Sequence, residues 1–167
     1  MITLFIIAGY VLISAGLYAA LRIRCKKDPV FRAPKSSAVF YAVSLTWGLP
    51  TVLPGAIVAL FLRLRGRKPV KTGREWGFLL PGVNWGLSLG LFFIAPVRSR
   101  STALHEVGHG IQNFYLGPFM PAVVLIPSFI RFWFFRIQRK RGRTPANRYD
   151  GVWFERSAAA SGEALSV

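Results

Sequence analysis

Apolar residues occur along the chain in four long segments. Residues 2–21 carry no charge over 20 positions, enough for a helix to cross a hydrocarbon core of roughly 30 Å. Residues 38–62, 76–97 and 118–135 form the other three segments. The pattern predicts an all-α fold, a polytopic membrane helical bundle with three to four membrane segments.

Prolines and glycines interrupt two of these segments. Residues 47–55 hold two prolines and two glycines, and residues 118–135 hold three prolines. Proline inside a helix removes a backbone hydrogen bond and clashes with the preceding turn, so we expect broken or re-entrant paths in both places. Positive charge on both flanks of residues 38–62 favours a re-entrant hairpin over a full span there.

Basic residues flank the apolar segments and give the chain a net charge of +16. They cluster in residues 22–35, 63–74 and 136–148. Such placement is typical of juxtamembrane segments that face the cytoplasm and contact anionic lipid headgroups. No base-reading module is recognisable, so we expect the lipid bilayer and no nucleic acid as partner. Cys25 is the only cysteine, which excludes an intramolecular disulfide.

The length of 167 residues fits one membrane-embedded domain. We expect membrane helices in residues 1–97, a motif helix and a re-entrant segment in 98–137, and a basic linker with an amphipathic helix in 138–167. The first apolar segment lacks the charged start and the cleavage site of a signal peptide, so we expect it to be retained as a span. Basic residues follow this segment and none precede it, which predicts that it runs from outside to inside.

The most specific chemical signal is the sequence His-Glu-Val-Gly-His at residues 105–109, which contains both histidines of the chain. We expect a helix over residues 101–116 that ends at Gly117. On a helix, histidines at i and i+4 project from the same face, so His105 and His109 can bind one Zn²⁺ ion. Glu106 can then serve as the catalytic general base toward water.

Two imidazoles do not complete a catalytic zinc site, which usually has three protein ligands. A metzincin would have a third histidine at position 115, which is Tyr115 here. The downstream carboxylates Asp150, Glu155 and Glu163 therefore remain as candidates. Glu155 is favoured because an unpaired carboxylate in its apolar helical context would be costly. Pairing of Glu155 with a basic neighbour such as Arg156 is the alternative to a metal bond.

With these residues the chain resembles the gluzincin type of zincin, in which a glutamate on a second helix completes the site. It looks still more like a group of small bacterial membrane proteins that carry an HExGHxxQ motif, then Leu-Gly-Pro, then Pro-Ser, then a glutamate-bearing helix. The matching residues are His105, Glu106, Gly108, His109, Gln112, Leu116, Gly117, Pro118, Pro127, Ser128 and Glu155. The resemblance covers roughly the last third of the chain, with Val107 replacing the usual aromatic residue. It implies zinc peptidase chemistry in a bacterial inner membrane.

Gln112 shares the metal face of the helix, so it is a candidate to contact substrate or to orient a ligand. Its alternative role is a hydrogen bond between helices. Asp150 stays a second candidate for such a role and an alternative third ligand, since site-2 proteases use an aspartate.

We therefore expect a membrane-associated zinc metallopeptidase, with its metal site near the cytoplasmic face and a peptide or membrane protein as substrate. A non-catalytic membrane scaffold or subunit with a structural or vestigial metal site is the alternative. A basic module that recognises anionic lipid is a third hypothesis.

Overall fold

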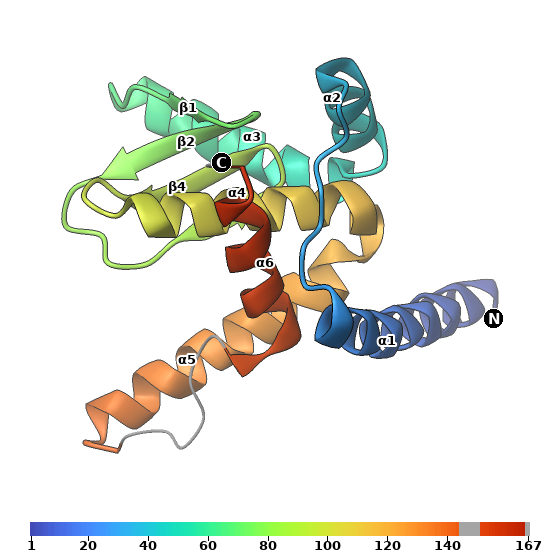
Figure 1. The fold of residues 1–167 in the computed structure, drawn as a ribbon. Helices are drawn as coiled ribbons and strands as arrows, with labels where there is room; N and C mark the ends of the chain where they lie inside the picture. The colour runs from blue at the N-terminus through green and yellow to red at the C-terminus, as the bar shows by residue number, and fades with distance from the viewer. Residues whose placement is uncertain (144–150, 166–167) are drawn as a thin grey trace.

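The computed structural model describes residues 1–143 and 151–165, and its first element is a long apolar helix, α1 (Ile2–Lys27). Its 26 residues extend over about 39 Å. Among the described residues, α1 is the one single helix that is long and apolar enough to cross a membrane. It extends away from the rest of the chain (Figure 1), and basic residues occupy its last turn.

The second apolar segment forms two helices, α2 (Ser37–Thr46) and α3 (Leu49–Leu64), which meet at 95°. The predicted break is confirmed, and it falls at Trp47 and Gly48. The hydroxyl of Ser36 accepts a hydrogen bond from the amide of Val39 and so caps the start of α2.

The third apolar segment is not a helix, so the predictions of an all-α fold and of a membrane segment over residues 76–97 are wrong. A short strand, β1 (Val70–Thr72), is followed by β2 (Glu75–Leu80), β3 (Leu87–Leu89) and β4 (Phe92–Pro96). These strands form one sheet in the order β1-β2-β4-β3. The pairing of β2 with β4 is parallel, and the two other pairings are antiparallel.

Two glycines explain why the chain turns back on itself here. Gly73 follows β1 and Gly90 follows β3, each as the first residue of a two-residue turn, with φ of +60° and +67°. Residues other than glycine rarely adopt such φ angles, and two-residue turns of this kind favour tight antiparallel hairpins.

The sheet has apolar residues on both faces because both faces are covered. Phe93 and Ala95 of β4 are buried against Ala103 and Val107 of the following helix. On the other side, Leu91 of the turn before β4 is buried against Phe40 of α2 and Val52 of α3. A strand that is covered on both sides has a continuous apolar sequence, which explains its resemblance to a membrane segment.

The motif helix is α4 (Arg100–Leu116), and it lies across one face of the sheet (Figure 1). The hydroxyl of Ser99 accepts a hydrogen bond from the amide of Thr102, 3.2 Å away, and caps the helix. The helix ends at Gly117, where φ is +52°. The expected motif helix is therefore present.

The chain bends sharply after the motif helix. A 3₁₀ turn, η1 (Gly117–Phe119), and a π-helical turn, η2 (Pro121–Leu125), lead into α5 (Ile126–Lys140). The helical stretches before and after Met120 differ in direction by 117°. The predicted interruption of this apolar segment is confirmed, and α5 extends from the body of the molecule (Figure 1).

The last described element is α6 (Trp153–Glu163), which packs along α4. The main apolar core lies between α6, α4, η2 and the end of α1, and includes Cys25, Ile111, Val124 and Phe154. The described residues thus form a mostly helical fold with a small sheet. They do not form a clear bundle of three to four spans, because α2–α3 and α4–α5 count as spans only if each bent pair crosses as one.

Candidate metal centre

The candidate site lies where helices α4 and α6 cross. The two helices run in opposite directions. A Cβ atom built on Gly108 would lie 1.9 Å from the carbonyl oxygen of Ala158, and one built on Gly162 would lie 1.9 Å from that of Leu104. Only glycine fits at these two contacts, because a real Cβ never approaches an oxygen so closely. The two glycines therefore allow the helix backbones to touch and fix which residues face one another.

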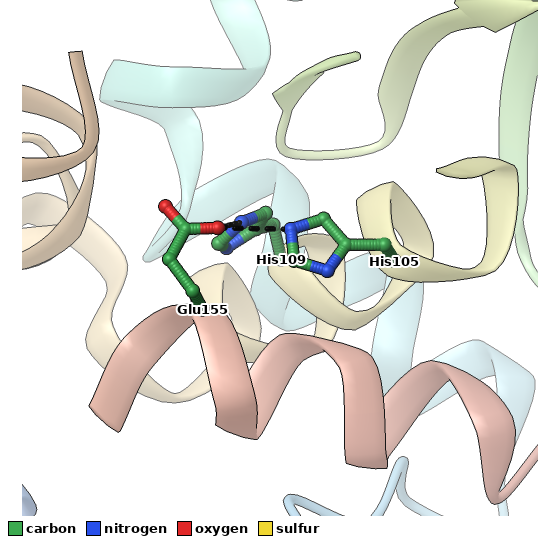
Figure 2. A group of neighbouring side chains, drawn as sticks. All are labelled: His105, His109 and Glu155. Carbon is green, nitrogen blue, oxygen red and sulfur yellow. Dashed lines mark hydrogen bonds and ion pairs between the residues drawn. The ribbon is translucent and has the colours of Figure 1, made fainter. Parts of the chain in front are cut away.

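This close crossing brings three side chains together (Figure 2). Nε2 of His105 lies 3.0 Å from Oε2 of Glu155, and Nε2 of His109 lies 3.5 Å from the same oxygen. One ligand atom from each residue can be chosen such that all three lie within 4.8 Å of one another. The Glu155 side chain is 1% exposed and that of His105 is 24% exposed, so the group opens toward its surroundings on the His105 side.

The residues fit a metal ion. Donor atoms around a tetrahedral Zn²⁺ lie about 3.3 Å apart when the bonds are about 2.0–2.1 Å long. The two histidine–glutamate distances, 3.0 and 3.5 Å, lie on either side of that value. Two imidazoles with one carboxylate are also a donor set that catalytic zinc takes. The group formed by His105, His109 and Glu155 can therefore hold a metal ion.

Gln112 fixes the proton position on His109. The Gln112 side-chain amide donates from Nε2 to the carbonyl oxygen of Phe154, 2.9 Å away, so its Oε1 faces Nδ1 of His109 at 2.9 Å. Oε1 can only accept, so Nδ1 must carry a proton and Nε2 is the ring nitrogen that faces Glu155. Gln112 thus holds the ring of His109 and links α4 to α6, and the hydrogen bond between helices that was its alternative role is present.

Ser128 of α5 holds the other oxygen of Glu155. Its hydroxyl donates to Oε1 at 2.5 Å, while Oε2 faces the histidines. Burial by itself would raise the pKa of Glu155, but the hydrogen bonds with His105 and His109, the charge of His109 and the Ser128 bond outweigh burial and hold that pKa well below its usual range. Glu155 is therefore kept ionised, as a metal ligand must be.

Glu106 is buried beside the group, under the backbone of Gly86, which immediately precedes β3. A Cβ atom on Gly86 would lie 2.0 Å from Oε1 of Glu106, so only glycine fits above this carboxyl group. Burial raises the pKa of Glu106 to about 8; the nearby His105 lowers it in part, and the charge of Glu155 raises it further.

Two other downstream carboxylates were candidates from the sequence. Asp150 lies outside the described residues. Glu163 is exposed at the end of α6 and is not among the three clustered side chains. Two contributors were missed by sequence reasoning: Ser128 was noted only as part of the Pro-Ser match, and Gly86 was given no role. Neither contact has a local sequence signal, since each forms between elements far apart in the chain.

Comparison with known proteins identifies no relative, because no protein-family model, no curated protein and no solved structure matches the chain. The geometry of the site is therefore the basis for assigning its chemistry.

Proposed function

We propose that the chain is a membrane-associated zinc metallopeptidase of the HExxH type. The observation that supports the proposal is the convergence of His105, His109 and Glu155 from α4 and α6, within 4.8 Å of one another. Glu106 follows the first of these histidines and is buried beside them. This combination supplies both a metal donor set and a carboxyl group for proton transfer.

Zn²⁺ held by the three residues would supply a Lewis acid that polarises the scissile carbonyl group and acidifies water. Glu106 then accepts a proton from the attacking water and passes it to the leaving amine. With a pKa of about 8 in the metal-free site, Glu106 holds a proton at neutral pH. A bound Zn²⁺ would lower this pKa as a nearby positive charge, and the carboxylate could then accept a proton from water. Gln112 keeps Nδ1 of His109 protonated, so that Nε2 stays available to the metal.

The position of the site relative to α1 supports a location near a membrane surface. Arg156 of α6 donates to the carbonyl oxygen of Cys25 at 2.7 Å, close to the basic end of α1. The amide of Phe31 donates to the hydroxyl of Ser161 at 2.8 Å. The basic end of a span favours the cytoplasmic side. We therefore propose that the metal centre lies near the cytoplasmic face of a bacterial inner membrane, with peptides or membrane proteins as substrates.

Metal analysis of the purified full-length protein is the first test. Wild type should bind about one Zn²⁺ per chain, and the double variant His105→Ala/His109→Ala should bind none. Glu155→Ala should lose zinc, whereas Glu163→Ala, a matched change on the same helix, should keep it. A wild-type protein that binds no divalent metal would overturn the proposal.

Catalysis needs its own experiment. Glu106→Gln should retain stoichiometric zinc but lose hydrolysis of a panel of quenched fluorescent peptides, because the amide cannot accept the proton. Full activity in Glu106→Gln would show that another group is the base.

A non-catalytic scaffold is the second candidate, and a specific contact favours it. Nε2 of His105 already lies within hydrogen-bond distance of Glu155, at 3.0 Å, so the cluster can link α4 to α6 without any ion. In that case His105→Ala should lower the thermal stability, while wild type should show neither bound zinc nor hydrolysis. Zinc-dependent hydrolysis by wild type would exclude this role.

A further inference from the structure

The α5 helix exposes an apolar stripe, hereafter the α5 stripe, on the side facing away from the protein. Its residues recur at the helical spacing i, i+3, i+4, i+7, i+8 and i+11, and each is between 43% and 63% exposed. The members of the stripe are Ile126, Phe129, Ile130, Trp133, Phe134 and Ile137. Six large apolar side chains in a continuous row on a protruding helix indicate an interaction surface.

The opposite side of α5 is already occupied by the protein. Phe135 is 7% exposed, and the hydroxyl of Ser128 donates to Glu155 of α6. The helix therefore presents one side to the body of the molecule and the α5 stripe outward. Figure 1 shows the helix itself at the margin of the molecule. Only the outer side of α5, which carries the α5 stripe, is left for a partner to cover.

Cationic side chains border the α5 stripe and continue beyond it. Arginines and lysines occupy six positions between residues 131 and 143, and no acidic residue occurs between 107 and 149. The guanidinium of Arg136 lies 5.6 Å from the ring centre of Trp133, and that of Arg131 lies 4.8 Å from the ring centre of Phe135. Long cationic side chains beside aromatic rings are typical of the boundary between acyl chains and headgroups.

The geometry of α5 disfavours a span. Its 15 residues extend over about 22 Å, less than the roughly 30 Å of a hydrocarbon core. The preceding turn η2 continues the helical stretch, but Val123 and Val124 hold it in the core of the protein. Arg131 and Arg136 lie in its middle, where a spanning helix would place them near the bilayer centre at high cost. The 117° bend before α5 also turns it away from the direction of α4.

We propose that α5 is an interfacial anchor that lies parallel to the membrane surface and binds anionic phospholipid. The α5 stripe enters the boundary between headgroups and acyl chains, and the cations along it pair with lipid phosphates. Charge complementarity selects an anionic lipid surface as the partner. Because Ser128 lies on the same helix, the metal centre is held at the depth of the headgroups.

This inference is independent of the zinc chemistry, since the orientation of α5 can be measured with or without a bound metal. Cys25 is the only cysteine, so a Cys25→Ala background accepts one spin label at a chosen site. Labels at Phe129→Cys, Trp133→Cys and Ile137→Cys report on the stripe. Arg139→Cys is the matched control, because its exposed side chain lies outside the stripe.

The measurement is label depth in full-length protein reconstituted into vesicles of phosphatidylcholine and phosphatidylglycerol, from collision rates with oxygen and with a water-soluble nickel chelate. An interfacial helix should place the three stripe labels at one common depth, about 5–10 Å below the phosphates, with the control in water. A depth that changes steadily by about 12 Å from residue 129 to 137 would show a span and overturn the proposal. Stripe labels that stay in water would overturn it in favour of a protein partner.

The requirement for anionic lipid is tested by changing the lipid composition of the vesicles. In vesicles of phosphatidylcholine alone, the stripe labels should move toward water, and Arg136→Gln should produce the same shift in the mixed vesicles. Equal depths in both lipids and in this variant would overturn the part assigned to anionic headgroups. Free inorganic phosphate added to the mixed vesicles should leave the depth unchanged if a bilayer, rather than phosphate itself, is the ligand.

Discussion

Gly108 of α4 contacts the carbonyl group of Ala158 on α6 so closely that a Cβ atom at position 108 would lie 1.9 Å from its oxygen. This backbone contact lies within the same crossing that joins His105 and His109 to Glu155. The ligand geometry and the packing of the two helices therefore depend on the same glycine.

Gly108→Ala is expected to separate α4 from α6 and to lower the stability by about 1–3 kcal/mol, the usual cost of overpacking. Cys25 is fully buried in the core that contains α6, so the reaction of its thiol with a fluorogenic maleimide during heating measures the loss of this packing. Gly16→Ala is the matched control, because a Cβ there meets no atom within 4 Å. A Gly108→Ala protein that melts with wild type would refute the close contact.

Gln112→Leu should weaken zinc binding by about 10- to 100-fold, as is typical when the partner of a ligating histidine is removed. The substitution removes the acceptor for Nδ1 of His109 and the bond to the carbonyl group of Phe154. Competition with a chromogenic chelator measures the affinity. Asn113→Leu is the control, since Asn113 is equally buried, but its side chain makes no hydrogen bond within the described part of the chain. Equal losses in both variants would indicate a packing effect.

The sequence predicted the helices better than the sheet. The uncharged run of residues 2–21 and the stop at Gly117 are local signals, and α1 and α4 follow them. The sheet was not predicted because a strand covered on both faces and a membrane helix both have continuously apolar sequences. Whether such a segment is a strand or a membrane helix depends on what packs on the two sides of Phe93. That packing is set by the tertiary structure.

In the candidate site, too, local features could be predicted from the sequence and tertiary contacts could not. The spacing of His105 and His109 is a property of one helix, so the sequence alone predicts that they converge. The proximity of Glu155 follows from the tight crossing at Gly108 and Gly162, which sequence spacing cannot supply. The hydroxyl of Ser128 reaches Glu155 only because the chain turns sharply before α5.

Ser128→Ala should release Oε1 of Glu155 and weaken zinc binding, because the carboxylate then loses the contact that orients Oε2 toward the histidines. We expect a loss of about tenfold, at the low end for a partner of a ligating group. Ser128→Thr retains a hydroxyl and should restore much of the affinity. If alanine and threonine behave alike, the orientation of Glu155 does not depend on this bond.

The buried carboxyl group of Glu75 predicts how the free energy of unfolding changes with pH. Its side chain is 1% exposed, and neither of its oxygens makes a hydrogen bond of good geometry with the described residues. Burial raises the pKa of Glu75 to about 8, and the nearby amides of Arg74 and Glu75 itself offset this only in part. The folded protein therefore holds the neutral form at a pH where the unfolded chain, with an ordinary pKa of 4.5, has already lost the proton.

The stabilising contribution of this protonation is complete below pH 4.5 and declines as the pH rises toward 8. Within that window the free energy of unfolding should fall by about 1.4 kcal/mol per pH unit through this group. Glu75→Gln imitates the neutral form at every pH, so its stability relative to wild type should increase between pH 5 and 8 and then level off. Chemical unfolding followed by tryptophan fluorescence at several pH values measures the difference. Parallel curves for the two proteins would show that the Glu75 carboxyl group is already ionised in the folded state.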